Sequence, residues 1–358
     1  MLQSLALLET QSILSGVDVV KQDVIEKEAV MPLTWSWDYD NSDSRIQNLY
    51  IKSVTEQWSA ADSLDWNLSV DPARPMRDVG GSLLSAGLVE RLSPVQRDKL
   101  MAGMGAMSFS QLLHGEQGAL MVSANLVRLL PSIEMKQAAA EQTGDEARHL
   151  DVFSRYIRRI GDIHPPSPPL RRVLDKIVNH RLWLAQMVGM QIVVEGMALA
   201  TFLDMRASCT CPLLRDILGL ILKDEARHVA FGKIALRRHI AEMDPDDRAE
   251  LDAFTLDLVA TFRNWGMEPE DLVNAACVMI DAGVDPTDMI AAVRQSGSEG
   301  RPLDLSRGMR YAFTALILPN LEQIGLIAPE AAEAVRATMP AQGDDLAALH
   351  RLERELMQ

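Results

Sequence analysis

The sequence contains little cysteine and has more acidic than basic residues. Three cysteines, Cys209, Cys211 and Cys277, are too few for a disulfide framework and are typical of a protein in a reducing cytoplasm. Cys209 and Cys211 have no second cysteine pair that would complete a metal site, so we interpret them as part of a tight turn. The formal net charge of −15 argues against a nucleic-acid partner, because a phosphate backbone requires a basic face.

The sequence also lacks an uninterrupted apolar segment that would cross a membrane. The strongest apolar run, residues 182–203, includes Gln186, Gln191 and Glu195. A carboxylate in lipid would be costly, whereas a central bundle helix can be apolar on all sides and carry one ligand. The first fourteen residues have no basic start and contain Glu9, which does not fit a signal peptide. We expect a cytoplasmic protein that does not contact a membrane.

The alternation of polar and apolar residues that indicates β-strands is missing as well. At 358 residues, 47% of them apolar, the chain can bury a large core, and we expect one enlarged helical domain. The predicted bundle helices span residues 94–129, 132–161, 170–208 and 212–242. A proline-rich segment separates the two helical hairpins, and Asp244-Pro245 ends the fourth helix. A fifth helix is expected at about 247–265, with further helices after residues 271, 288 and 330.

The part of the chain before the bundle is predicted to cover it. A weak helix is expected within residues 1–30, and a second helix around Ser44–Ala61. We interpret the aromatic residues here as a cover rather than a cofactor-binding motif: Trp35, Trp37, Tyr39 and Trp66. The predicted organisation is an N-terminal cover at 1–93, a bundle at 94–242 and a C-terminal helical extension at 243–358 that packs on the bundle.

Two segments carry the same five residues, Asp-Glu-Ala-Arg-His, at 145–149 and 224–228. Thirty residues separate Glu116 from Glu146, and thirty separate Glu195 from Glu225. The whole pattern repeats at an offset of 79 residues. A single Glu-x-x-His is usually a solvated or salt-bridged pair on a helix surface. Two copies at identical spacing, each with an upstream glutamate on an apolar stretch, indicate a metal site instead.

Each pair of glutamates is predicted to face its partner across a helical hairpin, because a turn lies midway, at Pro131-Ser132 and at 209–212. Fifteen residues on either side, at about 1.5 Å of rise each, place both glutamates roughly 22 Å from the turn. Glu and His three residues apart share one helix face. Two packed hairpins therefore bring together four carboxylates and two imidazoles, which we predict to be metal ligands and the catalytic centre: Glu116, Glu146, His149, Glu195, Glu225 and His228.

Four buried carboxylates are prohibitively costly unless their charge is compensated. Two divalent cations would cancel it, and a set of four Glu and two His suits two iron or manganese ions. With these ligands, residues 95–240 resemble the ferritin-like di-iron carboxylate superfamily. The resemblance implies an all-α fold: a ferritin-like four-helix bundle with a dinuclear metal site and additional N- and C-terminal helices.

Two aspartates that precede the ligand glutamates have a predicted supporting role. Metal-bound histidines usually donate their other ring N–H to a carboxylate or carbonyl. In ribonucleotide reductase small subunits, which the motif resembles, the later aspartate bonds the earlier histidine. The resemblance thus pairs Asp224 with His149, and pseudo-symmetry pairs Asp145 with His228. Salt bridges to Arg148 and Arg227 on the helix surface are the alternative.

Three positions narrow the function, because this fold hosts many activities. The radical tyrosine of ribonucleotide reductase small subunits usually lies four residues after the first histidine, where this chain has Phe153. Multicomponent hydroxylases have a threonine four residues after the third glutamate ligand, where this chain has Leu199. The stretch from Asp224 to Gly232 resembles stand-alone di-iron oxygenases related to p-aminobenzoate N-oxygenase. That enzyme has a third histidine where this chain has Ile221, so a general hydroxylase, a desaturase and a metal-dependent oxidase stay open beside an N-oxygenase.

The resemblance implies a non-heme di-iron monooxygenase that activates O2 to hydroxylate or N-oxygenate a small organic substrate. Its cofactors would be two iron ions, or a manganese–iron pair, with O2 as co-substrate and an external electron donor. A homodimer is also expected. Two alternatives remain: a ferritin-like metal-binding or storage protein, and a manganese/iron two-electron oxidase. An oxygenase should have a closed, substrate-sized apolar cavity beside the metals, whereas a storage protein should have a polar path for iron.

Overall fold

The computed structural model describes residues 33–39, 43–76, 88–263, 273–289, 307–337 and 351. The weak helix expected within residues 1–30 lies outside this range. The chain divides into two units, Met1–Leu33 and Thr34–Gln358, and all of the described helices belong to the second. The described residues form helices and no named strand, which confirms the all-α prediction.

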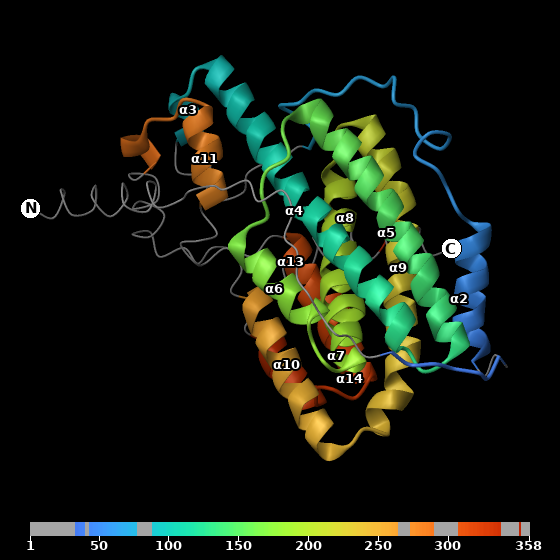
Figure 1. The fold of residues 1–358 in the computed structure, drawn as a ribbon. Coiled ribbons are helices and arrows are strands. Elements are labelled where there is room, and N and C mark those ends of the chain that lie inside the picture. Colours follow the sequence, from blue (N-terminus) through green and yellow to red (C-terminus); the bar gives the residue numbers. More distant parts are fainter. Residues whose placement is uncertain are drawn as a thin grey trace, which may run out of the picture. The chain divides into compact units, whose positions relative to one another are not determined.

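Four long helical segments form the centre of the fold (Figure 1). Helices α4 (Pro94–Leu129) and α5 (Ile133–Ile160) make the first hairpin, close to the predicted bounds. Helices α8 (Glu195–Ser208) and α9 (Pro212–Ala241) make the second. Cys209 and Cys211 are buried free thiols in the turn between them, as predicted.

The helix starts follow from local chemistry. Ser93 accepts a hydrogen bond from the backbone N–H of Gln96, and the Gln96 side chain returns to the backbone of Ser93. This capping box, followed by Pro94, satisfies backbone N–H groups that have no partner inside the helix. The Ser132 side chain accepts a hydrogen bond from the backbone N–H of Met135 and so caps α5.

The predicted continuous helix at 170–208 is wrong. The chain instead forms α6 (Pro168–Val178), α7 (Trp183–Met187), the π-helical segment η2 (Val188–Val194) and then α8. The break between α6 and α7 contains neither proline nor glycine. His180 stabilises it, because its ring nitrogen accepts from the N–H of Leu182 and its carbonyl accepts from the amide of Gln186.

The apolar segment Trp183–Ser208 is long and apolar enough to span a membrane, with a mean hydropathy of 1.4 in its best window. However, 78% of that window is buried inside the protein. Its neighbours explain this burial, since α8 contacts α9, α13 and η4. The segment is therefore a central helix of the bundle, as expected from its internal carboxylate and amides.

Helix α2 (Ser44–Thr55) packs against α5 and α9, the two helices that carry the repeated motif. The side chains of Trp58 and Trp66 just after it are partly buried against the core. By contrast, Trp35, Trp37 and Tyr39 are 68%, 73% and 67% exposed. Trp35 and Trp37 stack on each other instead, with ring centroids 5.1 Å apart.

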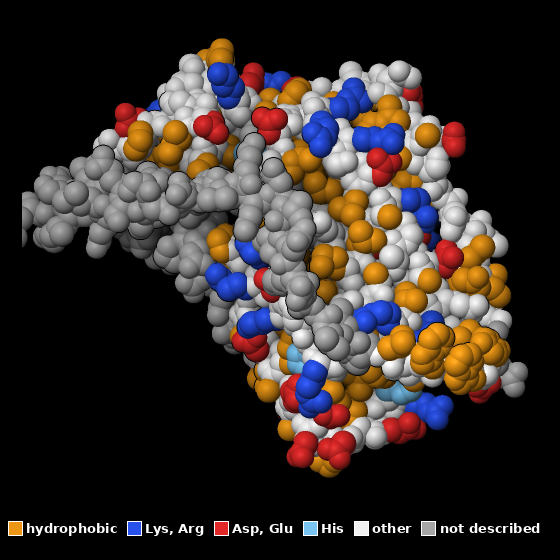
Figure 2. All heavy atoms as spheres, in the orientation of Figure 1, with side chains coloured by type: hydrophobic (Ala, Val, Ile, Leu, Met, Phe, Trp, Pro, Cys, Tyr) orange, Lys and Arg blue, Asp and Glu red, His pale blue; other side chains and the backbone are white. Residues whose placement is uncertain are grey.

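The described C-terminal helices add a further layer. Helix α11 (Val273–Asp281) packs on α4, whereas α13 (Arg307–Tyr311) and the π-segment η4 (Ala312–Ile317) pack on α8. The remaining described helices are α3 (Leu88–Arg91), α10 (Pro245–Arg263), α14 (Leu318–Gln323) and α15 (Pro329–Ala337). Acidic and basic side chains are interspersed on the face drawn in Figure 2.

Candidate metal centre

The six predicted ligands come together in the core. Glu146 and His149 project from α5, and Glu225 and His228 project from α9, each pair three residues apart on one helix face. Glu116 comes from the middle of α4, and Glu195 is the first residue of α8. All six are at most 4% exposed. The sequence pattern therefore placed these side chains at one level of the bundle.

Two carboxylates lie between the two histidines. Oxygens of Glu146 are 3.3 Å from Nδ1 of His149 and 3.3 Å from Nδ1 of His228. Oxygens of Glu225 are 3.3 Å and 3.5 Å from the same two nitrogens. Each of these carboxylates thus has one oxygen for each half of the site, which is the arrangement that a bridging ligand requires.

The other two carboxylates each belong to one half. Glu116 is 3.2 Å from Nδ1 of His149, and Glu195 is 3.7 Å from Nδ1 of His228. Potential ligand atoms form two groups, each within 4.8 Å: Glu116, Glu146, His149 and Glu225 in one, and Glu146, Glu195 and His228 in the other. We name these the His149 position and the His228 position.

Each histidine faces an aspartate of the opposite hairpin with its remaining nitrogen. Nε2 of His149 is 3.1 Å from Oδ2 of Asp224, and Nε2 of His228 is 3.2 Å from Oδ2 of Asp145. A carboxylate accepts and cannot donate, so the proton is on Nε2 and Nδ1 is directed toward the glutamates. Arg148 pairs with Asp145 and Arg227 with Asp224, so each aspartate contacts both a histidine and an arginine.

The buried surroundings shift the pKa values of the carboxyl groups in different directions. Desolvation raises the pKa of Glu116 well above its ordinary value, and desolvation together with the charge of Glu225 raises the pKa of Glu195 to about 8. Desolvation also acts on Asp224, but hydrogen bonding to His149 and the charge of Arg227 lower its pKa to about 2. Without metal, the cluster therefore keeps protons on some carboxyl groups and charge on others.

Both histidines hold protons more tightly than usual. Burial alone would lower the pKa of His149, but the charge of Glu116 and the hydrogen bond to Asp224 raise it well above the ordinary value. The pKa of His228 rises in the same way through Glu146 and Asp145. A divalent cation would compete with these protons for Nδ1 of each ring.

The donor atoms fit a pair of divalent ions. Glu146 Oε2, both carboxylate oxygens of Glu225 and Nδ1 of His228 are buried and have no hydrogen-bond partner. Buried polar atoms without a partner are rare, because each costs desolvation free energy. Two divalent ions would coordinate these atoms and balance four carboxylate charges.

Sequence reasoning missed Trp58, which adjoins this cluster. Its Nε1–H donates to Oδ2 of Asp224 at 2.8 Å, and its ring lies nearly parallel to His149, with centroids 6.2 Å apart. It also missed two buried amides near Glu195, Gln142 and Gln191. No motif marks these three residues. The only signal in the sequence for the two glutamines is that each is a polar residue within a predicted bundle helix.

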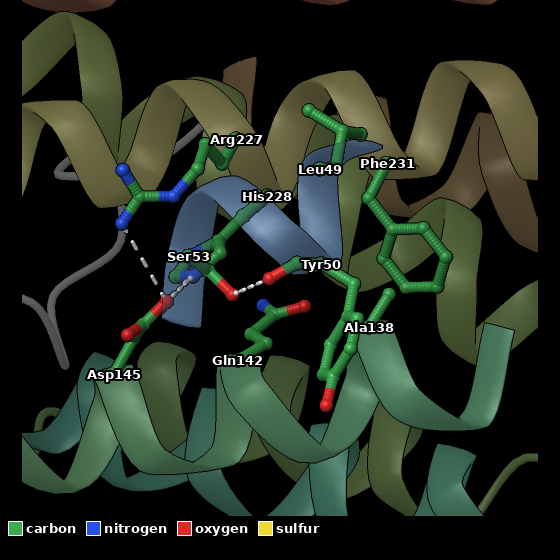
Figure 3. A pocket seen from close by; sticks show the side chains of 9 residues that line it. All are labelled: Leu49, Tyr50, Ser53, Ala138, Gln142, Asp145, Arg227, His228 and Phe231. Atoms are coloured by element: carbon green, nitrogen blue, oxygen red, sulfur yellow. Dashed lines mark hydrogen bonds and ion pairs between the residues drawn. The ribbon is translucent and has the colours of Figure 1, made fainter. Parts of the chain in front are cut away.

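A hollow lies between α2, α5 and α9 beside His228 (Figure 3). Its volume is about 20 Å³, enough for a water molecule. Drug-sized ligands occupy pockets of roughly 300–1,000 Å³, so this hollow is not the substrate-sized apolar cavity expected of an oxygenase. Its lining mixes apolar and polar side chains: Leu49, Tyr50, Ser53, Ala138, Gln142, Asp145, Arg227, His228 and Phe231.

The fold and the buried cluster define a ferritin-like protein of the dinuclear carboxylate class. Residues 40–312 match the family described as P-aminobenzoate N-oxygenase AurF. The match spans most of the chain, so the protein belongs to this family. It is an oxidoreductase of the di-iron oxygenase and oxidase class, which acts with O2 on a small-molecule substrate.

Solved structures with similar folds share little sequence with this chain. An R2-like ligand-binding oxidase variant with a reconstituted Mn/Fe cofactor is 15% identical, covers 81% of this chain and 96% of its own, and has a TM-score of 0.49. Dimanganese(II)-NrdF of Streptococcus sanguinis is 12% identical over 90% of this chain and 99% of its own, with a TM-score of 0.48. No curated protein matches the chain.

Proposed function

We propose that this protein is a di-iron monooxygenase that transfers an oxygen atom from O2 to a small organic substrate, by hydroxylation or N-oxygenation. The observation that carries this proposal is the convergence of six buried ligands in two groups that share Glu146. Membership of the N-oxygenase family supports the same reaction class.

In this proposal, each position has its own pair of ligands. Glu116 and His149 would hold one ion and Glu195 and His228 the other, while Glu146 and Glu225 contact both histidines. Two bound iron ions supply the redox chemistry with O2 that no side chain of this chain provides. Asp224 and Asp145 keep the Nε2 protons in place, so that Nδ1 of each histidine stays available as a ligand.

The surrounding core excludes water from this chemistry. Phe153 is fully buried next to His149 along α5 and contacts Phe202 of α8, with ring centroids 5.6 Å apart. Leu199, one turn after Glu195, is 5% exposed. Because these side chains are apolar, they neither coordinate a metal nor donate a proton, and they keep the site dry.

We further propose that residues 1–93 and 243–358 complete the enclosure of a bundle at 94–242, and that the protein works in the cytoplasm as a homodimer that receives electrons from an external donor. The small hollow beside His228 implies that an organic substrate needs space beyond it.

Single-turnover chemistry tests the reaction class. The protein is loaded anaerobically with Fe(II), given a chemical reductant and then exposed to isotopically labelled O2 with an arylamine or an aromatic hydrocarbon. Mass spectrometry should find one labelled oxygen atom in the product. The Glu146→Ala variant is the control, because it lacks a ligand shared by both positions.

Two outcomes would contradict the proposal. Uptake of many irons per chain as a mineral core would favour a storage protein. Consumption of O2 without label in any organic product would favour a two-electron oxidase, and metal analysis would then show whether the active pair is iron or manganese with iron.

A further inference from the structure

The two halves of the site differ at the residues one helical turn before each ligand glutamate. The position four residues before Glu146 is Gln142, and the position four residues before Glu195 is Gln191. The equivalent positions before Glu116 and Glu225 are Leu112 and Ile221. The offset of 79 residues relates Leu112 to Gln191 and Gln142 to Ile221. By this offset, the amide pair Gln142 and Gln191 corresponds to the apolar pair Ile221 and Leu112.

Gln142 contacts two of the carboxylates directly. Its Nε2 donates to Oε1 of Glu146 at 3.1 Å and to Oε1 of Glu195 at 2.9 Å. The same two oxygens lie 3.3 Å and 3.7 Å from Nδ1 of His228. The amide therefore uses both of its N–H donors on ligands of the His228 position.

Gln191 holds Gln142 in this orientation. Its Nε2 donates to Oε1 of Gln142 at 2.5 Å, which directs the carbonyl of Gln142 toward Gln191 and its N–H groups toward the carboxylates. Gln142 is 2% exposed and Gln191 is fully buried, so water does not compete for these bonds. Hydrogen bonds to charged groups are also stronger than those between neutral groups.

The backbone around Gln191 provides the room for this contact. Gln191 lies in the π-helical segment η2, which ends immediately before Glu195. Gly232 of α9 packs against it, and a Cβ atom at position 232 would overlap the side chain of Gln191. The π-helical segment and Gly232 thus allow the amide of Gln191 to lie close to the cluster.

We propose that Gln142, held by Gln191, is a positioning residue that makes the two metal positions unequal by orienting Glu146 and Glu195 at the His228 position. This inference rests on the dinuclear centre of the proposed function. Among the residues that the structure describes, the His149 position has no equivalent support, because apolar Leu112 and Ile221 occupy the corresponding places in the other half.

Single-site variants separate the two positions. His149→Ala retains the His228 position, and His228→Ala retains the His149 position. Gln142→Leu is then added to each, and Mn(II) binding is measured by titration calorimetry and by the EPR signal of bound Mn(II). Loss of an outer hydrogen-bond partner typically weakens metal binding about 10–100-fold. We expect that loss in the His149→Ala background and less than about two-fold change in the His228→Ala background.

A matched control removes a buried amide that does not contact the cluster. Gln186 is 2% exposed, lies on the same helical segment as Gln191 and donates to the carbonyl of His180 at 2.8 Å. Gln186→Leu should leave Mn(II) affinity unchanged in both backgrounds, whereas Gln191→Leu should weaken binding in the same background as Gln142→Leu. Far-UV circular dichroism and thermal unfolding of the metal-free variants show whether each one folds.

Equal loss in both backgrounds, no loss in either, or an equal effect of Gln186→Leu would overturn the inference. If Gln142→Leu does not fold, Gln191→Leu decides, because it leaves both carboxylate contacts chemically possible and removes only their orientation. Failure of the wild-type protein to bind two Mn(II) ions would instead refute the dinuclear centre, and the inference with it.

Discussion

Nε2 of His149 lies 3.1 Å from Oδ2 of Asp224, a residue on the opposite helical hairpin. The same oxygen accepts the Nε1–H of Trp58 at 2.8 Å, while the other oxygen pairs with Arg227. The three groups around Asp224 are all hydrogen-bond donors. Only a carboxylate can accept from them on both of its oxygens. The charge and shape of this one residue determine which nitrogen of His149 can bind a metal.

The first prediction concerns Asp224→Asn. The new amide must direct its NH2 group either toward His149 and Trp58 or toward Arg227, and both faces already contain donors. We expect Mn(II) affinity to fall about 10–100-fold, as is typical when a partner of a metal-bound histidine is lost. Titration calorimetry measures this affinity directly.

Trp58→Phe provides the matched comparison for this variant. It removes one donor to Asp224 but preserves the contact between Asp224 and His149, so metal affinity should change far less. Loss of a hydrogen bond to a charged group should still lower the free energy of unfolding by roughly 1.5–3 kcal/mol. Equal metal affinity in Asp224→Asn and the wild type would refute the positioning role of this aspartate.

The second prediction concerns metal stoichiometry. The purified wild-type protein should bind two Fe(II) or Mn(II) ions per chain, as measured by elemental analysis after removal of free metal. Glu146→Ala should lower the content at both positions because Glu146 contacts both histidines. His228→Ala should remove mainly one ion.

Asp151→Ala is the control for these variants. Asp151 lies on the same helix, but its side chain is 43% exposed and pairs with Arg155 on the surface. Its removal should leave two ions bound, since an exposed ion pair contributes little to stability. Full metal content in both Glu146→Ala and His228→Ala would rule out the assigned ligands.

The third prediction is a pH dependence of the metal-free protein. A carboxyl group with a raised pKa binds more protons in the folded state, so its contribution to stability is lost as pH rises. For Glu195, whose pKa rises from 4.5 to about 8, this loss occurs between these two values. The raised pKa values of His149 and His228 act in the same direction. Melting temperature should therefore fall between pH 5 and pH 8.

Metal should reverse this trend. Divalent ions bind the deprotonated ligands, so their affinity rises with pH. At a free concentration of 100 times Kd, a ligand stabilises the folded state by about 2.7 kcal/mol. The difference in melting temperature between Mn(II)-loaded and metal-free protein should thus grow from pH 5 to pH 8. Parallel curves for the two forms would contradict the coupling between protons and metal.

The sequence predicted the bundle well wherever a helix had a chemical signal at its end. Helices α4, α5 and α9 begin at Pro94, after Ser132 and at Pro212, where capping residues or proline fix the first turn. The third helix was predicted wrongly for two reasons. The residues at the break near His180 include neither proline nor glycine, so no breaker signal marks it. From Trp183 onward the residues are apolar on nearly every side, so the π-helical turn could not be inferred from a hydrophobic phase.

The site residues differ in how far a local sequence pattern marks them. The glutamates and histidines form a repeated pattern, and their spacing placed them on shared faces. Gln142, Gln191 and Trp58 reach the cluster through contacts between distant segments, such as the bond between Trp58 and Asp224. A single sequence has no local pattern that reports such contacts.

The π-helical segment Val188–Val194 sets the rotation, about the helix axis, of the residues that precede Glu195. A π-turn accommodates one residue more than an α-turn, so a single inserted codon suffices to create it. The segment lies before Glu195, and the thirty-residue spacing of the second hairpin equals that of the first. An insertion there would rotate the preceding residues about the helix axis by roughly 100° relative to Glu195. Removing one residue from this segment would therefore turn Gln191 away from Gln142 without changing the spacing between Glu195 and Glu225.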